Sequence, residues 1–108
     1  MTQSYAPNID VPIEAIAEFC RRWEITEFAL FGSVLREDFA PESDVDVLVS
    51  YRPGTRITLQ RLVAMEDELA ELFQRKVDLI DREAVVASPN YIRRREVLRT
   101  AQVIYAAG

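Results

Sequence analysis

Two stretches of this chain repeat apolar residues at helical spacing. The first places one apolar stripe along residues 13–23, at Ile13, Ile16, Ala17, Cys20 and Trp23. The second does the same between Thr58 and Phe73, at Leu62, Met65, Leu69, Leu72 and Phe73. A helix with one apolar face buries that face against a neighbouring layer. Both stretches are therefore predicted to be amphipathic helices that pack on a sheet.

Shorter apolar runs predict the strands of that sheet. They are Glu27–Phe31, which ends at Gly32, then Asp44–Ser50 and Lys76–Ile80. A further helix is predicted after the Ser88-Pro89-Asn90 break, running to about Arg99, while 102–105 fits either a last strand or a frayed helix end. This order of elements predicts an α/β (α+β) fold in which a small mixed β-sheet is flanked by helices.

Composition narrows the class of protein. The 108 residues, 49% of them hydrophobic, suit a single domain over 1–108, with 1–10 as a loosely ordered lead-in. No apolar run approaches the roughly 20 residues of a membrane-spanning helix, and the first ten residues lack a secretion signal. A lone Cys20 and the absence of histidine exclude an internal disulfide and histidine-based catalysis. We expect a cytoplasmic protein that does not associate with membranes.

Charge is distributed unevenly along the chain. The net charge of −5 argues against direct nucleic-acid binding, which requires a basic face. Basic residues gather late, at Arg93, Arg94, Arg95 and Arg99. An ordinary solvated face is the interpretation favoured here, with a contact surface for an acidic partner or a triphosphate as the alternative. The acids of the second helix, Glu66, Asp67, Glu68 and Glu71, are likewise predicted to form a solvated face.

The end of the first predicted strand and the start of the second carry residues typical of a metal and nucleotide site. Gly32 and Ser33 follow the first apolar run, and after ten further residues Asp44 and Asp46 open the next. Alternate residues of a strand share a face, so the two carboxylates point the same way. The two negative charges repel each other, and a hard cation bound between them removes this repulsion. Mg²⁺ is such a cation, and it prefers phosphates and water as its other ligands. A glycine turn offers backbone N–H groups to those phosphates.

These residues carry a family resemblance. Gly32-Ser33, then Asp44-Val45-Asp46 after the fixed interval, resembles the signature of nucleotidyltransferases whose palm is like that of DNA polymerase beta. The flanking runs, 30–36 and 43–49, resemble those of the minimal nucleotidyltransferases. The resemblance covers roughly Ile25 to Asp81, about half of the chain. The chain departs from the family pattern at Glu37, where many relatives have glycine. This difference affects the expected path of the turn and not the expected metal ligands.

A third carboxylate is expected from a later strand. Asp78 interrupts the apolar run of Val77 and Leu79, where an ionised group is costly unless something compensates for it. The family's third acid occurs in such a strand, so the resemblance assigns this role to Asp78. Asp81 is the competitor, but its place at the strand end is typical of a turn residue. Arg36 fits a phosphate or acceptor contact as well as it fits a solvent-exposed or salt-bridged arginine.

The resemblance implies an enzyme. It implies catalytic and metal-binding roles for Asp44, Asp46 and Asp78 with two Mg²⁺ ions, nucleotide contacts from Gly32, Ser33 and Arg36, and ATP as substrate. Minimal members are commonly antitoxins, so the implied acceptor is a tyrosine hydroxyl of a HEPN ribonuclease toxin, held in a hetero-oligomer and silenced by AMPylation. About 100 residues leave no room for an acceptor-binding domain, so another macromolecule is expected to present the hydroxyl. Two alternatives stay open: an antitoxin that acts by occlusion alone, and a transferase for a small hydroxylated compound.

Overall fold

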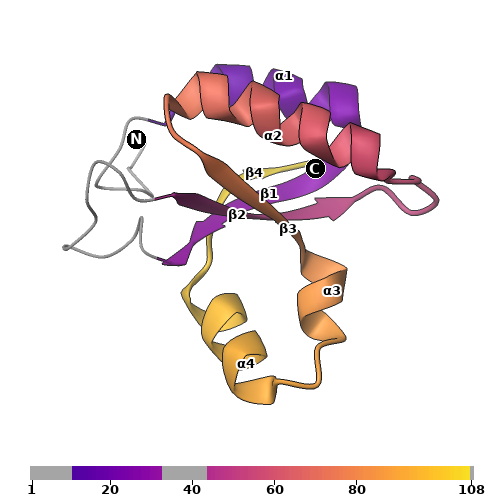
Figure 1. Ribbon diagram of the computed structural model, residues 1–108, viewed down its shortest axis with the longest axis vertical. Helices are drawn as coiled ribbons and strands as arrows, with labels where there is room; N and C mark the ends of the chain where they lie inside the picture. Colours follow the sequence, from indigo (N-terminus) through magenta and orange to yellow (C-terminus); the bar gives the residue numbers. More distant parts are fainter. Residues whose placement is uncertain (1–10, 33–43, 108) are drawn as a thin grey trace.

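A mixed four-stranded sheet with helices on both faces organises the chain (Figure 1). The computed structural model describes residues 11–32 and 44–107. Its helices are α1 (Ile13–Trp23), α2 (Leu59–Phe73), α3 (Arg82–Val86) and α4 (Tyr91–Thr100), and its strands are β1 (Ile25–Phe31), β2 (Val45–Tyr51), β3 (Val77–Asp81) and β4 (Gln102–Ala106). The predicted lead-in, 1–10, lies outside the described residues. No helix within these described ranges is long and apolar enough to cross a bilayer.

The sheet runs in the order β3-β2-β1-β4. β1 pairs antiparallel with both β2 and β4, whereas β2 and β3 run parallel. The predicted mixed sheet is confirmed. The alternative left open for 102–105 is also decided, because these residues pair with β1 as strand β4.

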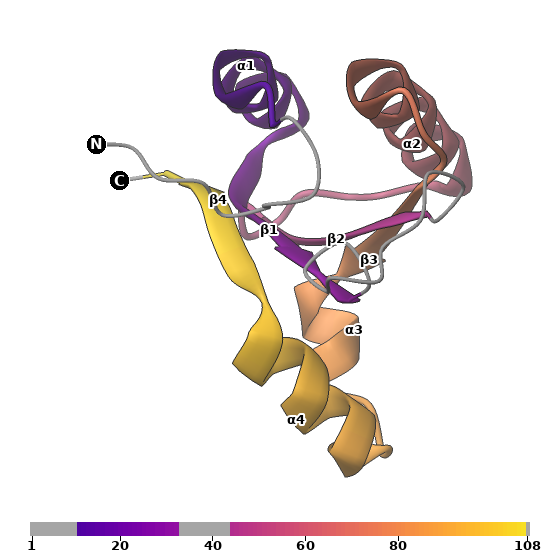
Figure 2. The ribbon, with the colours of Figure 1, turned by 90° about the vertical axis from the view of Figure 1, so that its left-hand side faces the viewer.

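The main core lies between the sheet and the layer formed by α1 and α2, which lie side by side on one face (Figure 2). Val45, Val47 and Val49 of β2 point into this core and are fully or almost fully buried. The rings of Phe19 on α1 and Phe28 on β1 meet edge to face, with centroids 6.4 Å apart. Both predicted amphipathic helices thus pack most of their apolar stripes on the sheet, as expected from their spacing, although Ile13 at the start of α1 is exposed.

The opposite face of the sheet carries α3 and α4 (Figure 1). A smaller cluster joins this face to the two helices through Ala29, Phe31, Leu48, Val85 and Val97. Helix α3 was not predicted, because its five residues are too short to display a period. The side chain of Asp81 caps α3 by accepting a hydrogen bond from the Glu83 N–H, 2.9 Å away. Asp81 is therefore the last residue of β3 and the N-cap of α3, so it lies at the strand end as expected but is not a turn residue.

The prediction of a wholly solvated acidic face on α2 is wrong for two residues. Glu68 pairs with Arg22 and accepts a hydrogen bond from Trp23 Nε1 at 3.1 Å, which ties α2 to α1. Glu66 accepts a hydrogen bond from the backbone N–H of Leu79 at 3.1 Å. Sequence spacing could not reveal either contact, because both partners come from distant parts of the chain.

Candidate active site

Asp46 on β2 and Asp78 on β3 lie directly opposite each other in the sheet. Adjacent strands are spaced about 4.8 Å apart, so two acids in register on one face hold their carboxylates near each other. That face is the one covered by α3 and α4, because the alternating residues Val47 and Leu79 are buried in the main core. Asp46 is half-buried and Asp78 is exposed. Asp78, predicted because it interrupts an apolar run, thus lies beside Asp46 although it follows that residue by 32 positions in the sequence.

Gly32 brings a turn of backbone against the Asp46 carboxylate. Phe31, the residue before it, is the register partner of Asp46 on β1. Gly32 has a φ of +80°, and a Cβ atom added there would collide with Asp46 Oδ2. Both the dihedral angle and the close approach therefore require glycine at this position. Ser33 and Arg36, predicted to bind nucleotide beside it, lie outside the described residues.

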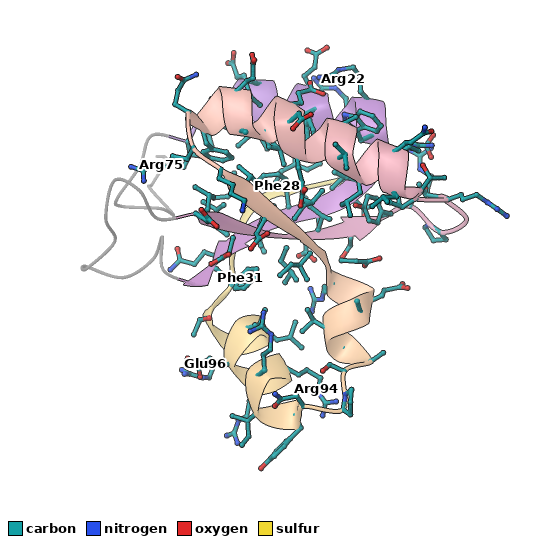
Figure 3. All side chains as sticks on the ribbon, in the orientation of Figure 1. Arg22, Phe28, Phe31, Arg75, Arg94 and Glu96 are labelled. Atoms are coloured by element: carbon teal, nitrogen blue, oxygen red, sulfur yellow. The ribbon has the colours of Figure 1, made fainter. Side chains whose placement is uncertain are left out.

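A cleft of about 1330 Å³ opens over the two aspartates. Gly32, Asp46 and Asp78 form its lining on the sheet side. The other side is formed by α4 and the start of β4, and Figure 3 shows the Phe31 ring between the sheet and α4. A cleft of this size, with acids on one wall and polar groups on the other, suits a polar, phosphate-bearing ligand.

The basic helix contributes to this cleft, although Arg93, Arg95 and Arg99 are exposed, as the interpretation of a solvated face expected. Arg93 and Arg99 line the cleft. Arg94 turns instead towards the α3–α4 connection and donates hydrogen bonds to the carbonyl oxygens of Val86 and Ser88, at 3.4 and 3.0 Å. Arg99 also pairs with Glu96, a third carboxylate of the lining, at 3.2 Å. The cleft thus carries charges of both signs, an arrangement that suits a metal-bound polyphosphate.

Sequence reasoning missed four polar residues of the lining, which are Asn90, Glu96, Thr100 and Gln102. The sequence signal of Asn90 concerned only the helix start, because an asparagine after a proline is typical of that position, and it gave no indication of the cleft. Asn90 does cap α4, accepting a hydrogen bond from the Arg93 N–H at 3.1 Å. Thr100 and Gln102 carried no signal, since their place in the cleft follows from the return of the chain into β4.

Asp44, the remaining predicted ligand, precedes β2 by one residue and is not part of the cleft lining. Within residues 11–32 and 44–107, no group of three or more acids, cysteines or histidines is arranged to hold a metal. Three carboxylates line the described part of the cleft: Asp46 and Asp78 are in register, whereas Glu96 is paired with Arg99, so the candidate ligands are the pair Asp46 and Asp78. One or two carboxylates together with substrate phosphates are the usual ligand set of Mg²⁺, so the pair fits this ion.

Comparison with known proteins identifies the family. Residues 13–102 match the family model described as a nucleotidyltransferase domain. The chain belongs to this nucleotidyltransferase family. Two proteins of Methanocaldococcus jannaschii, each named as a putative protein adenylyltransferase, are similar to it in sequence. They are 32% identical over 68 residues and 34% identical over 64 residues, and the matches span 63% and 59% of this chain and 67% and 63% of the relatives' own lengths.

Solved structures agree with this assignment. A minimal nucleotidyltransferase is 30% identical, with a TM-score of 0.64 over 83% of this chain and 86% of that one. A chain of a toxin–antitoxin complex with AMP-PNP shares the fold at 17% identity, with a TM-score of 0.68 over 90% and 75% of the two chains. A complex of a tri-AMPylated Shewanella oneidensis HEPN toxin with an MNT antitoxin gives 16% identity and a TM-score of 0.58 over 88% and 70%. The resemblance of this nucleotidyltransferase to minimal members of the family is confirmed.

Proposed function

We propose that this nucleotidyltransferase transfers AMP from ATP to a tyrosine hydroxyl of a HEPN-domain toxin and thereby neutralises it. The observation that carries the proposal is the register pair of Asp46 and Asp78, held beside the Gly32 turn on a cleft that two arginines also line. The named relatives support protein adenylylation, and the complexes with AMP-PNP and with an AMPylated HEPN toxin support the nucleotide and the partner.

In this proposal the acceptor oxygen attacks the α-phosphorus of ATP, the bond from that phosphorus to the bridging oxygen breaks, and pyrophosphate leaves. The Asp78 carboxylate is the exposed member of the pair and takes up the proton of the acceptor hydroxyl. The Gly32 backbone and the Ser33 hydroxyl hold the β- and γ-phosphates. Arg93 and Arg99, on the opposite wall, balance the charge of the triphosphate.

Asp46 and Asp78 are the residues that would hold Mg²⁺ in the described part of the cleft, and Asp44 is the proposed additional ligand. Oxygen donors in register are the type that this hard ion selects. When bound, Mg²⁺ neutralises phosphate charge and favours the deprotonated acceptor. Two ions are proposed, as in the family that the sequence resembles.

The test is intact-mass measurement after incubation with ATP, Mg²⁺ and the product of the open reading frame adjacent to this gene. We expect that product to gain one or more AMP units. Asp46→Asn and Asp78→Asn should abolish the gain, because each removes one carboxylate of the pair. Asp67→Asn is the matched control, since Asp67 is exposed on α2, across the sheet from the cleft.

The outcome separates the proposal from its two alternatives. Stable binding of the adjacent product without any gain of mass, by wild type and variants alike, would favour neutralisation by occlusion. AMP transfer to an aminoglycoside but not to the protein would favour a small hydroxylated acceptor. Transfer that survives both Asp46→Asn and Asp78→Asn would show that the carboxylate pair is not the catalytic site.

A further inference from the structure

The outer side of α4 is exposed to an unusual degree for a helix of a folded domain. Of its ten residues only Val97 is buried. Tyr91 and Ile92 keep 57% and 71% of their surface accessible. A helix of this length is marginal alone and gains its stability from packing. Large apolar side chains left open on such a helix indicate a surface that another molecule covers.

These side chains border a shallow hollow of about 400 Å³, here called the α4 hollow, which is lined by Tyr91, Ile92, Arg95, Glu96 and Arg99. The hollow adjoins the catalytic cleft, because Ile92, Glu96 and Arg99 line both. A molecule seated in the α4 hollow therefore lies at the mouth of the cleft. Arg94 holds α4 to the preceding loop, so the surface is presented on a fixed element.

Charge indicates the chemistry of the occupant. Helix α4 carries four arginines and one glutamate within a chain of net charge −5. Arg95 belongs to the α4 hollow and not to the cleft, so the triphosphate does not account for it. Arginine and tyrosine at the centre of a contact are the residue types that contribute most to protein–protein affinity. An acidic and partly apolar protein surface complements this combination.

We propose that the α4 hollow is the docking surface for the acceptor protein. An acidic and apolar segment of that protein sits on Tyr91, Ile92 and Arg95, and the segment delivers the acceptor hydroxyl into the cleft beside Asp78. This inference rests on the proposed function for the identity of the acceptor, and it adds the surface by which the acceptor is held.

Docking is measured separately from chemistry, as the affinity of the full-length chain for the adjacent gene's product without ATP. Arg95→Glu and Tyr91→Asp should each weaken binding at least tenfold, because one reverses a charge and the other places a charge on an apolar contact. Arg56→Glu and Leu59→Asp are matched controls and should bind as wild type does, since both residues are exposed. Leu59 begins α2, on the sheet face opposite α4, and Arg56 lies just before that helix (Figure 1). Reversing the contacting acid of the partner to lysine should restore binding to Arg95→Glu.

Several outcomes separate the two proposals. Weakened binding of the α4 variants, with a fluorescent ATP analogue still bound and with unchanged far-UV circular dichroism, supports docking even if no AMP is transferred. Wild-type affinity in both variants overturns docking, even if AMP transfer is confirmed. Binding of a labelled RNA oligonucleotide that is lost in Arg95→Glu, while the protein partner binds normally, also overturns it.

Discussion

The carboxylate of Glu66 on α2 accepts a hydrogen bond from the backbone N–H of Leu79, with 3.1 Å between Oε2 and N. Leu79 lies on β3, an edge strand that pairs only with β2 in the described sheet. In a parallel pair, alternate residues of an edge strand turn their backbone groups away from the partner and leave them without a ladder bond. Glu66 satisfies one such group next to Asp78. Helix α2 thereby anchors the strand that carries half of the carboxylate pair.

Replacing Glu66 should therefore impair catalysis from outside the cleft. We expect Glu66→Ala to lower the free energy of unfolding by about 1–2 kcal/mol, because the partly buried backbone N–H of Leu79 loses a charged hydrogen-bond acceptor. The rate of AMP transfer should fall while the affinity for the acceptor protein is unchanged. Glu66→Gln keeps an acceptor oxygen and should restore most of both losses. Equal rates in Glu66→Ala and in the exposed-site control Asp67→Ala would refute this positioning role.

A comparison of alanine substitutions at two glycines separates the effect of the close contact at Gly32 from the effect of its backbone angle. Gly32 and Gly54 both have positive φ, at +80° and +89°, but only Gly32 has another residue within reach of an added Cβ. Gly54→Ala should cost about 1 kcal/mol of stability from the dihedral angle alone. Gly32→Ala should cost more and should also abolish AMP transfer, since the methyl group displaces the Asp46 carboxylate. Chemical denaturation and the intact-mass assay check both; similar losses of stability for the two variants would contradict the collision.

Mg²⁺ should stabilise the folded protein through the carboxylate pair. A ligand that binds only the native state raises stability by RT ln(1 + [L]/Kd), about 2.7 kcal/mol at one hundred times Kd. In the presence of ATP, the melting temperature should rise when Mg²⁺ replaces a chelator. Asp78→Asn should lose that rise, while Asp67→Asn should keep it. Calorimetric scans measure the difference, and a full Mg²⁺ response in Asp78→Asn would place the ion elsewhere.

Cys20 should be inert in the native protein. It is completely buried in the main core, and burial raises the pKa of its thiol to about 12. Aromatic disulfide reagents at pH 8 should label it only after denaturation. Because the folded pKa exceeds the unfolded value of 9.0, this contribution to stability is full below pH 9 and is lost as the pH rises towards 12. Rapid labelling without denaturant would contradict the packing of α1 on the sheet.

The sequence alone was sufficient for most of the secondary structure. Period and alternation depend on neighbours only a few positions apart, so α1, α2 and the first three strands could be recognised from them. The five residues of α3 are too few to show a period. Strand β4 looked ambiguous because most of its residues are only partly covered, with Val103 exposed at 41%, so its pattern lacked a buried face.

Gly32, Asp46 and Asp78 could likewise be selected as candidates from the sequence. The glycine turn and the spacing of the acids are local features, and the interruption of an apolar run by Asp78 can be read directly from the sequence. Only the tertiary structure decided that Asp46 and Asp78 share a register, that Glu66 supports the strand of the second, and that Arg93 and Arg99 line the same cleft. Each of these relationships joins residues brought together by strand pairing or helix packing. Such contacts are set by the burial of the whole core, and no local stretch of the chain contains them.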